Sequence, residues 1–325
     1  MLHTYAARNG KLSDATANAV PEDAVWVDVI DPTVDEDKRL LAQLGIDIPT
    51  RDEMLEIEPS SRLYEENGGL YMTALVTWKA DQEPQNTPVA FVVTPKLMVT
   101  VRFADPRPFT SFQQRCIKQP RQMATSDTAF VSLMEVIVDR AADLLERSGA
   151  ELDAVSSEIF RARANPIGRR PRIPPVDLEE ALQRIGRQYH LASMVRESFV
   201  SLGRVVAFFR QAASGWMQED IAARLRTVDR DLRALAEHDT YLSQKTNFML
   251  DATMGLINND QNKIIKIFSV VAVIFLPPTL VASIYGMNFN LMPELHWHLG
   301  YPWALLLMVA SAVLPYWYFK RQGWL

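Results

Sequence analysis

The sequence predicts an α/β domain, then a series of long α-helices, and finally two membrane-spanning helices near the C-terminal end. Short segments rich in β-branched and aromatic residues alternate with turns up to about residue 115, which is typical of a sheet. Apolar residues then recur at helical spacing. Residues 267–293 contain no charged side chain, although charged residues make up 22% of the 325 residues, and about 20 apolar residues suffice to cross a bilayer.

The composition argues against nucleic acid as a partner and against a disulfide framework. A net charge of −5 lacks the basic excess that nucleic acids attract. The single cysteine, Cys116, can form neither an intrachain disulfide nor a cysteine metal cluster, and it favours a reducing compartment. The first residues lack the apolar core of a signal peptide, so we expect a cytosolic N-terminus.

The α/β part is expected to form a small sheet with helices packed on it. The predicted strands are bounded by Pro, Asp, Asn or Gly and cover residues 24–30, 69–78, 89–93 and 96–102. Helix starts are expected at residues 31–33 and 49–54, where acidic residues follow a turn, because the positive end of a helix attracts them.

Two long helices joined by a hinge are expected next. The first begins near Ser126 and has an apolar side up to Ile159. Residues 161–175 are rich in proline and cannot continue it. The second runs from Asp177 to about Ala213. The arginines of the hinge either face solvent or touch anionic headgroups, and the absence of aromatic residues there favours solvent.

A third long helix is expected to continue directly into the first membrane span. From about Met217 nothing breaks a helix before Pro277, a length of roughly 90 Å at a rise of about 1.5 Å per residue. Apolar residues recur every seven positions, at Ile221, Val228, Leu235, Leu242, Met249 and Leu256. The companion positions turn polar, at Asp239, Thr246, Thr253 and Asp260. We therefore expect the upper half to pack on the chain's own helices and the polar lower half to form a hydrated seam between copies; a plain surface helix is the alternative.

A second span is expected at residues 301–319, because aromatic residues at both of its ends are typical of the membrane interfaces. Basic residues lie on the outer flanks of the two spans, and the loop between the spans has neither lysine nor arginine. They are Lys263, Lys266, Lys320 and Arg321. Since basic residues stay on the cytoplasmic side, we expect both termini in the cytoplasm and the loop outside.

One face of the first span is narrower and more polar than the rest. At helical spacing it contains Asn262, Ile265, Ser269, Ala272, Leu276, Thr279 and Ser283. Such a face lines a pore or packs against a neighbouring helix, and small residues do not distinguish the two. The hydroxyl groups can equally satisfy backbone carbonyls freed by Pro277 and Pro278, where we expect an interruption of the helix.

The first span ends in Gly286, Met287 and Asn288, an uncharged polar turn at the expected exit from the membrane. The amide of Asn288 offers a carbonyl oxygen without a charge, which suits a hydrated Mg²⁺ ion that releases water reluctantly. The alternative is a helix cap with the asparagine in the left-handed conformation. The residues alone leave both interpretations open.

These residues resemble the CorA family of divalent-cation channels, within the metal ion transporter superfamily that has the Gly-Met-Asn motif. The resemblance rests on residues 285–289, on residues 292–295 of the following loop, on two C-terminal spans and on a basic tail. Segments closer to the N-terminus also resemble the family's cytosolic domain, and they are residues 25–33, 49–76 and 97–109. The resemblance therefore covers the whole chain.

The resemblance implies a funnel-shaped homopentamer in the bacterial inner membrane that takes up Mg²⁺, and also Co²⁺ or Ni²⁺, and closes when cytosolic Mg²⁺ binds. It implies that Gly286, Met287 and Asn288 form the selectivity filter, that the chain is not an enzyme, and that Mg²⁺ is cargo and regulator rather than a cofactor. The parts would be a cytosolic α/β domain (1–125), a helical hairpin (126–216), a stalk (217–263), the pore-lining span (264–288), a periplasmic loop (289–300), the second span (301–320) and a basic tail (321–325).

The gate and the sensor of cytosolic Mg²⁺ stay open at this point. A hydrophobic constriction is expected at Leu276, Phe268 or Ile265, since one apolar ring per turn can exclude water from a narrow pore. Acidic candidates for the sensor are Asp81, Asp229, Asp239, Asp251 and Asp260. We favour Asp251, because it precedes Asn262 by eleven residues, about three turns, on the same face, where copies would form a ring of carboxylates.

Glu294 is the only formal charge in the outer loop, and it either concentrates cations at the mouth of the pore or is simply solvated. Two alternatives to a Mg²⁺ channel are compatible with parts of the sequence. One is a zinc transporter of the same superfamily, against which the intact Gly-Met-Asn triplet favours Mg²⁺. The other is a membrane-anchored cytosolic signalling module, but the sequence has no phosphate-binding glycine loop, HExxH or nucleophile motif.

Overall fold

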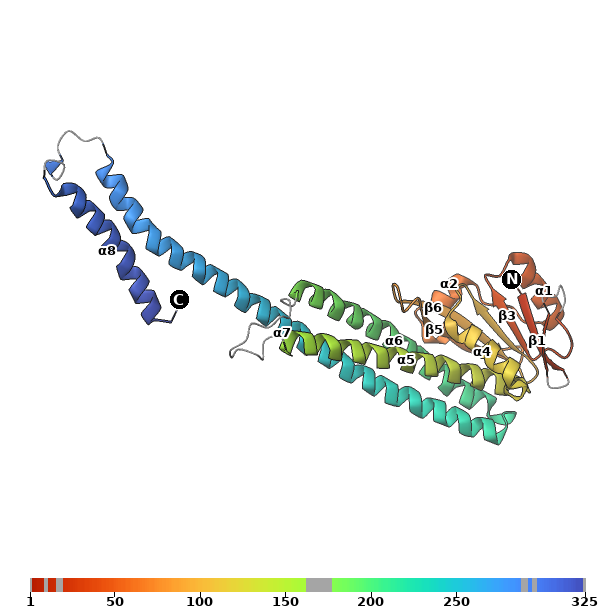
Figure 1. Cartoon of the computed structure of the whole chain (residues 1–325). Coiled ribbons are helices and arrows are strands. Elements are labelled where there is room, and N and C mark those ends of the chain that lie inside the picture. The colour runs from red at the N-terminus through yellow and green to blue at the C-terminus, as the bar shows by residue number, and fades with distance from the viewer. Residues whose placement is uncertain are drawn as a thin grey trace. The chain divides into compact units, whose positions relative to one another are not determined.

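The computed structural model describes residues 2–8, 11–15, 20–161, 177–287, 292–293 and 297–323. The chain divides into two compact units, residues 1–250 and 251–325, and each is described by itself. Figure 1 shows the sheet and its helices, the long helix α7 (Glu219–Tyr285) and the final helix α8 (Gly300–Arg321).

A seven-stranded mixed sheet forms the centre of the first unit, in the order β2-β1-β3-β7-β6-β5-β4. The strands are β1 (Leu2–Arg8), β2 (Lys11–Ala15), β3 (Trp26–Ile30), β4 (Leu63–Glu66), β5 (Gly69–Trp78), β6 (Gln85–Val93) and β7 (Met98–Arg102). β3 and β7 are parallel, and the other described pairs are antiparallel. The four predicted strands are confirmed as β3, β5, β6 and β7, whereas β1, β2 and β4 were not predicted.

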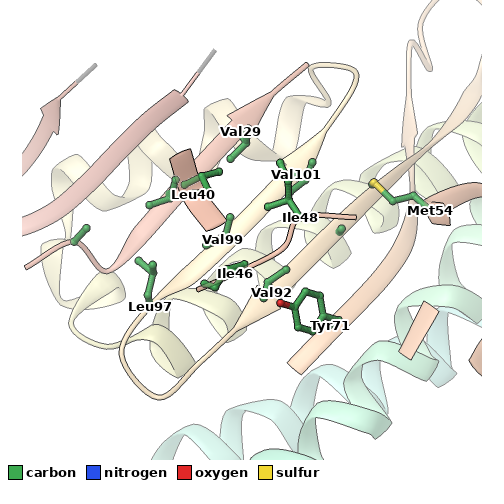
Figure 2. Close-up of a cluster of buried hydrophobic side chains, with 13 residues drawn as sticks. Val29, Leu40, Ile46, Ile48, Met54, Tyr71, Val92, Leu97, Val99 and Val101 are labelled. Atoms are coloured by element: carbon green, nitrogen blue, oxygen red, sulfur yellow. The ribbon is translucent and has the colours of Figure 1, made fainter. Parts of the chain in front are cut away.

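One face of the sheet is covered by α1 (Val34–Leu44), α2 (Arg51–Leu55) and the segment between them. Alternate strand residues such as Val27 and Val99 point into this core, because successive side chains of a strand face opposite ways. Leu40 of α1 and Met54 of α2 belong to the same buried cluster and pack against these strand residues. Figure 2 shows that the cluster is built from side chains of several strands and both helices.

Both helices begin with a capping box, which confirms the two helix starts expected from the sequence. Thr33 precedes α1 and accepts a hydrogen bond from the amide of Glu36, whose side chain accepts one from the amide of Thr33. Thr50 and Glu53 repeat the arrangement at α2. Each box satisfies amides that have no partner within their own helix.

The opposite face of the sheet is covered by α4 (Arg107–Lys118), α5 (Ser126–Arg161) and α6 (Leu178–Ala212). Trp26 of β3 meets Phe112 of α4 edge-on, with ring centroids 5.1 Å apart. Phe130 of α5 lies 5.8 Å from Phe91 of β6 and 4.2 Å from Phe209 of α6. The sheet is therefore buried on both faces, as expected of an α/β architecture.

The hairpin of α5 and α6 belongs to the same compact unit as the sheet. On α6, Ser201 accepts a hydrogen bond from the amide of Leu75 in β5 at 2.9 Å, and Ser198 donates one to the carbonyl of Leu75 at 2.7 Å. Shorter helical turns complete this unit: α3 (Pro59–Arg62), η1 (Pro120–Met123) and η2 (Ala213–Gly215). The hinge expected at 161–175 lies almost wholly outside the described residues.

In the first unit α7 packs along α5 and α6 with more of its surface than the sequence predicted. Its early apolar residues are buried, as expected: Ile221, Leu225, Val228 and Leu232. The polar positions Asp239 and Thr246 are also fully buried inside the chain itself, which corrects the expected hydrated seam at this level. Arg196 of α6 donates to Oδ2 of Asp239 at 2.6 Å, so the chain supplies a partner for one oxygen of the buried carboxylate, while Oδ1 has none among the described residues.

A buried ion pair links β3 to β7. Asp28 is 0% exposed and Arg102 2%. Arg102 donates to the Asp28 carboxylate through Nε at 3.1 Å and through Nη2 at 2.9 Å, and Thr100 donates to it at 2.7 Å. The remaining nitrogen, Nη1, donates to the Ala104 carbonyl at 2.8 Å and to Asp105 at 2.6 Å. One guanidinium therefore joins the sheet to the segment that leads into α4.

Candidate functional site

The second unit consists of the C-terminal part of α7 and of α8. Within the described residues, these two helices are long and apolar enough to cross a membrane. Only 6% of the most apolar window of each is buried inside the chain, so neither is the covered core helix of a soluble domain. The two predicted spans therefore correspond to continuous helices with lipid-compatible surfaces.

Helix α7 continues through Pro277 and Pro278 to Tyr285, which corrects the expected interruption. A proline has no amide hydrogen, so the carbonyls of Val273 and Ile274, four residues earlier, lose their intrahelical donors. The two prolines thus create two adjacent acceptors within a regular helix rather than a break.

Each membrane helix has one covered stripe. On α7 the less exposed residues include Val270, Ile274, Pro277, Val281 and Tyr285. On α8 they include Ala304, Met308, Ser311, Pro315 and Phe319. Both sets follow the three- and four-residue spacing of one helical face. The rest of each helix surface is open to lipid, to water or to another chain.

The seven residues predicted to share the narrow polar face of α7 lie opposite its covered stripe. All of them are exposed: Asn262, Ile265, Ser269, Ala272, Leu276, Thr279 and Ser283. At about 100° per residue, the centre of this face is roughly half a turn away from the centre of the stripe. The face is therefore available to a pore or to another copy, and its role as pore lining stays a prediction.

The three gate candidates are all large, apolar and exposed. Ile265 is 60% exposed, Phe268 70% and Leu276 66%. Ile265 and Leu276 are eleven residues apart and so share one line along the helix. Exposure alone does not separate the three candidates.

The end of the first span is tightly built. The amide of Gly286 donates to the Ala282 carbonyl at 2.9 Å, and the amide of Met287 donates to the Ile284 carbonyl at 3.2 Å. A Cβ atom on Gly286 would lie 3.1 Å from the Ala282 carbonyl oxygen, so a larger residue would require a shift of a few tenths of an ångström there. Asn288 and Glu294 lie outside the described residues.

The basic end of α8 has the features of a membrane interface. The ammonium of Lys320 lies 5.9 Å from the ring centre of Tyr316, and the guanidinium of Arg321 lies 5.6 Å from that of Trp317. Long basic side chains over aromatic rings are typical of the headgroup region. This agrees with a span that ends close to Arg321.

The acidic sensor candidates on α7 differ in their surroundings. Asp251 is exposed. Asp229 accepts from Arg210 at 3.3 Å and from Arg233 at 2.9 Å, and Asp260 accepts from Lys263 at 3.1 Å. Asp239 is buried, and burial raises the pKa of its carboxyl group even though Arg196 opposes the shift. Of these four candidates, Asp251 is thus the exposed one without a basic partner among the described residues.

Asp81, the candidate in the α/β part, is surrounded by arginines. Arg147 donates to one of its oxygens at 2.8 Å, while Arg107 and Arg140 lie 3.0 and 3.9 Å from the other. The hydrogen bond from Arg147 lowers the pKa of Asp81, as do the nearby positive charges, and burial opposes them. A divalent cation at Asp81 would have to compete with these groups. Within the described ranges, no set of three His, Cys, Asp or Glu side chains is placed to hold a metal.

This arginine cluster was not predicted from the sequence. A signal was present, because Arg140 and Arg147 are seven residues apart on a helix and so lie on one side of it. Arg107 could not have been joined to them from spacing, since it comes from another helix.

A large α/β unit followed by two helices suited to a bilayer defines a two-span membrane protein with a large soluble part. The chain belongs to the family described as CorA-like Mg²⁺ transporter protein, which it matches over residues 21–321. The predicted family and the predicted class, a magnesium transporter rather than an enzyme, are confirmed at that level.

Relatives match over nearly the whole length. The magnesium transport protein CorA of Sodalis glossinidius (strain morsitans) is 36% identical, with 100% of both chains covered. That of Salmonella typhimurium is 35% identical over 93% of this chain and 92% of its own. Among solved structures, the complete CorA magnesium transporter of Methanocaldococcus jannaschii matches with a TM-score of 0.77 at 16% identity, covering 100% of this chain and 99% of its own. Full-length CmaX matches with a TM-score of 0.68 at 15% identity, covering 99% and 97%. At such identities the structural matches show the fold.

Proposed function

We propose that the chain forms a homopentameric channel that admits Mg²⁺ into the cytoplasm across the bacterial inner membrane, with Co²⁺ and Ni²⁺ as further permeant ions. The proposal rests on the observed properties of the first span. It has no charged residue between Lys266 and the outer loop, an exposed polar face opposite its covered stripe, and the triplet Gly286-Met287-Asn288 at its end. The curated relatives named magnesium transport protein CorA support the choice of ion.

The proposed filter works on the hydrated ion. Mg²⁺ dehydrates reluctantly, so a ring of Asn288 amide oxygens would accept hydrogen bonds from its water shell instead of replacing it. At Gly286 an added Cβ atom would meet the Ala282 carbonyl oxygen at 3.1 Å, which favours glycine at the start of the proposed filter. Glu294 would raise the cation concentration at the mouth, an effect that weakens as ionic strength rises.

Gating would combine an apolar constriction with an acidic sensor. Rings of Leu276, Phe268 or Ile265 can exclude water from a narrow pore. Copies of the exposed Asp251 would repel each other when empty and hold a divalent cation when it is abundant, which links cytosolic Mg²⁺ to packing of the α7 helices. Both termini would lie in the cytoplasm, since the basic residues flank the two spans on that side.

The filter is tested by Asn288→Ala in vesicles containing the purified full-length protein. Mg²⁺ uptake, followed with a trapped dye, should fall by at least about tenfold, because the amide oxygens that face the hydration shell are gone. Asn290→Ala, which alters the next asparagine along the chain, serves as the control and should retain uptake. Unchanged uptake in Asn288→Ala at equal pentamer content would remove the assignment, and competition by Co²⁺, Ni²⁺ and Zn²⁺ in the same assay ranks the ions.

A further inference from the structure

Asp81, in the loop between β5 and β6, is surrounded by more positive charge than one carboxylate can neutralise. Asp81, in this loop, faces three arginines: Arg107 at the start of α4, and Arg140 and Arg147 on α5. Two further acids are close: Asp105, which already accepts from the buried Arg102 at 2.6 Å, and Asp143, whose charge also acts on Arg140. The local charge is therefore positive, although the chain as a whole carries −5.

Arg140 is the least satisfied member of this cluster. Its side chain is only 21% exposed, and its nearest acid oxygen, on Asp81, is 3.9 Å away, too far for a hydrogen bond. It donates no hydrogen bond to any residue in the described ranges. Burial lowers the pKa of Arg140, and the charges of Arg147 and Arg107 lower it further, against the weaker opposing effects of Asp81 and Asp143. A partly buried guanidinium group without a hydrogen-bond acceptor favours the binding of an anion, because the anion supplies the missing acceptor.

A cavity of about 280 Å³ lies beside this cluster. Its walls include Trp78, Lys79, Asp81, Arg107 and Arg140. The N-terminus of α4 also borders it, and no side chain caps that helix by a hydrogen bond. Its positive end therefore adds to the charge of the arginines. Small-ligand sites begin at about 300 Å³, so the space suits a small polyanion or one end of a larger ligand.

We propose that this cavity binds a phosphate-bearing anion with two or more negative charges, held by Arg140 and Arg107. Guanidinium groups donate paired hydrogen bonds to phosphate oxygens, which makes arginine a preferred phosphate ligand. The anion would supply Arg140 with acceptors and would compete with Asp81 for Arg107. The proposal concerns the first unit alone and does not depend on ion transport.

Two sources offer this chemistry, a free polyphosphate and a nucleoside polyphosphate. Trp78 borders the cavity and is partly exposed, with the Lys79 ammonium 4.3 Å from its ring centre. A nucleotide base could stack at this indole, which a bare polyphosphate cannot do. Tighter binding of ATP than of tripolyphosphate, lost in Trp78→Leu, would identify the nucleotide; equal binding would identify the phosphates alone.

The test is calorimetric titration of the full-length protein in detergent with pyrophosphate, tripolyphosphate and ATP, in EDTA so that no Mg²⁺ masks their charge. Arg140→Gln should weaken binding by about tenfold or more, and Arg140→Lys should lose less because it keeps the charge. Arg115→Gln is the matched control on α4, since Arg115 pairs with Asp139 and does not line the cavity. It should change affinity by less than about twofold.

A second variant predicts a gain, which a folding defect cannot imitate. Asp81→Asn removes the carboxylate that competes for the arginines, so it should strengthen binding by about fivefold. The proposal is overturned if none of the three anions binds at millimolar concentration. It is equally overturned if Arg140→Gln binds as tightly as the unmodified protein, or if chloride competes as well as pyrophosphate does.

Discussion

The buried pair of Asp28 and Arg102 allows a stability effect to be worked out from the structure. The variant Arg102→Met keeps an unbranched apolar stem of similar course and removes the guanidinium. The Asp28 carboxylate, 0% exposed, then retains the Thr100 hydroxyl as its remaining side-chain donor among the described residues. The link from the sheet to Ala104 and Asp105 disappears as well.

The expected cost is large because an uncompensated charge stays buried. Removing one partner of a buried pair costs about 3–5 kcal/mol. For a domain of 150–250 residues, 1 kcal/mol corresponds to about 2–4 °C in Tm, so the melting temperature of the first unit should fall by roughly 6–20 °C.

The assay is thermal unfolding of the full-length protein in detergent, followed by tryptophan fluorescence at one fixed heating rate. Trp26 reports on this region, since its indole donates to Thr100 at 2.9 Å. Arg115→Met is the control, because Arg115 and Asp139 form an exposed pair that is worth at most about 1 kcal/mol.

Two results would refute the reasoning. One is a fall in Tm for Arg102→Met no larger than that of the control. The other concerns the double variant Asp28→Asn/Arg102→Met, which removes the unpaired charge and should recover part of the loss. A double variant less stable than Arg102→Met would show that packing, not the buried charge, carries the effect.

Two further predictions concern acids of α7. The pKa of Asp239 is raised by burial, so its favourable effect on stability is complete below its unfolded pKa and is lost as pH rises through the folded one. Asp239→Asn should therefore gain in Tm relative to the unmodified protein as pH increases from 4 to 8. If its Tm relative to the unmodified protein increased toward acid pH instead, the ion pair with Arg196 would outweigh the effect of burial on Asp239. Asp251→Asn should weaken the protection that Mg²⁺ gives against protease. The control is Asp231→Asn, which changes another exposed acid of α7. An unaltered Mg²⁺ dose response in Asp251→Asn would place the sensor elsewhere.

Regular elements were predictable where their signals are local. The capping boxes at Thr33 and Thr50 lie within four residues of sequence, and the apolar side of α5 up to Ile159 follows one helical period. The strands β1, β2 and β4 were missed because their stability comes from pairing with neighbours rather than from their own residues. Helix α4 was missed although Phe109, Phe112 and Cys116 share one face, and all are buried.

The polar positions in the seven-residue repeat of α7 show why a hydrated seam was wrongly predicted for Asp239 and Thr246. A polar residue at a core position predicts a wet surface only when no partner is nearby. Asp239 is buried because Arg196, 43 residues earlier, donates to it, and Thr246 because its hydroxyl donates to the Leu242 carbonyl one turn before. The interruption predicted at Pro277 and Pro278 was also wrong, since the surrounding helix tolerates the loss of two amide donors.

The sequence by itself determined the family, the two spans and the triplet at the end of the first, because hydropathy and a short motif are properties of neighbouring residues. The tertiary structure alone decided which acids are accessible. It left Asp251 exposed, buried Asp239, and placed Asp81 among arginines up to 66 residues away. Charges at such separations meet only when strands and helices pack, and the energy of a charge depends on that surrounding rather than on the residue type.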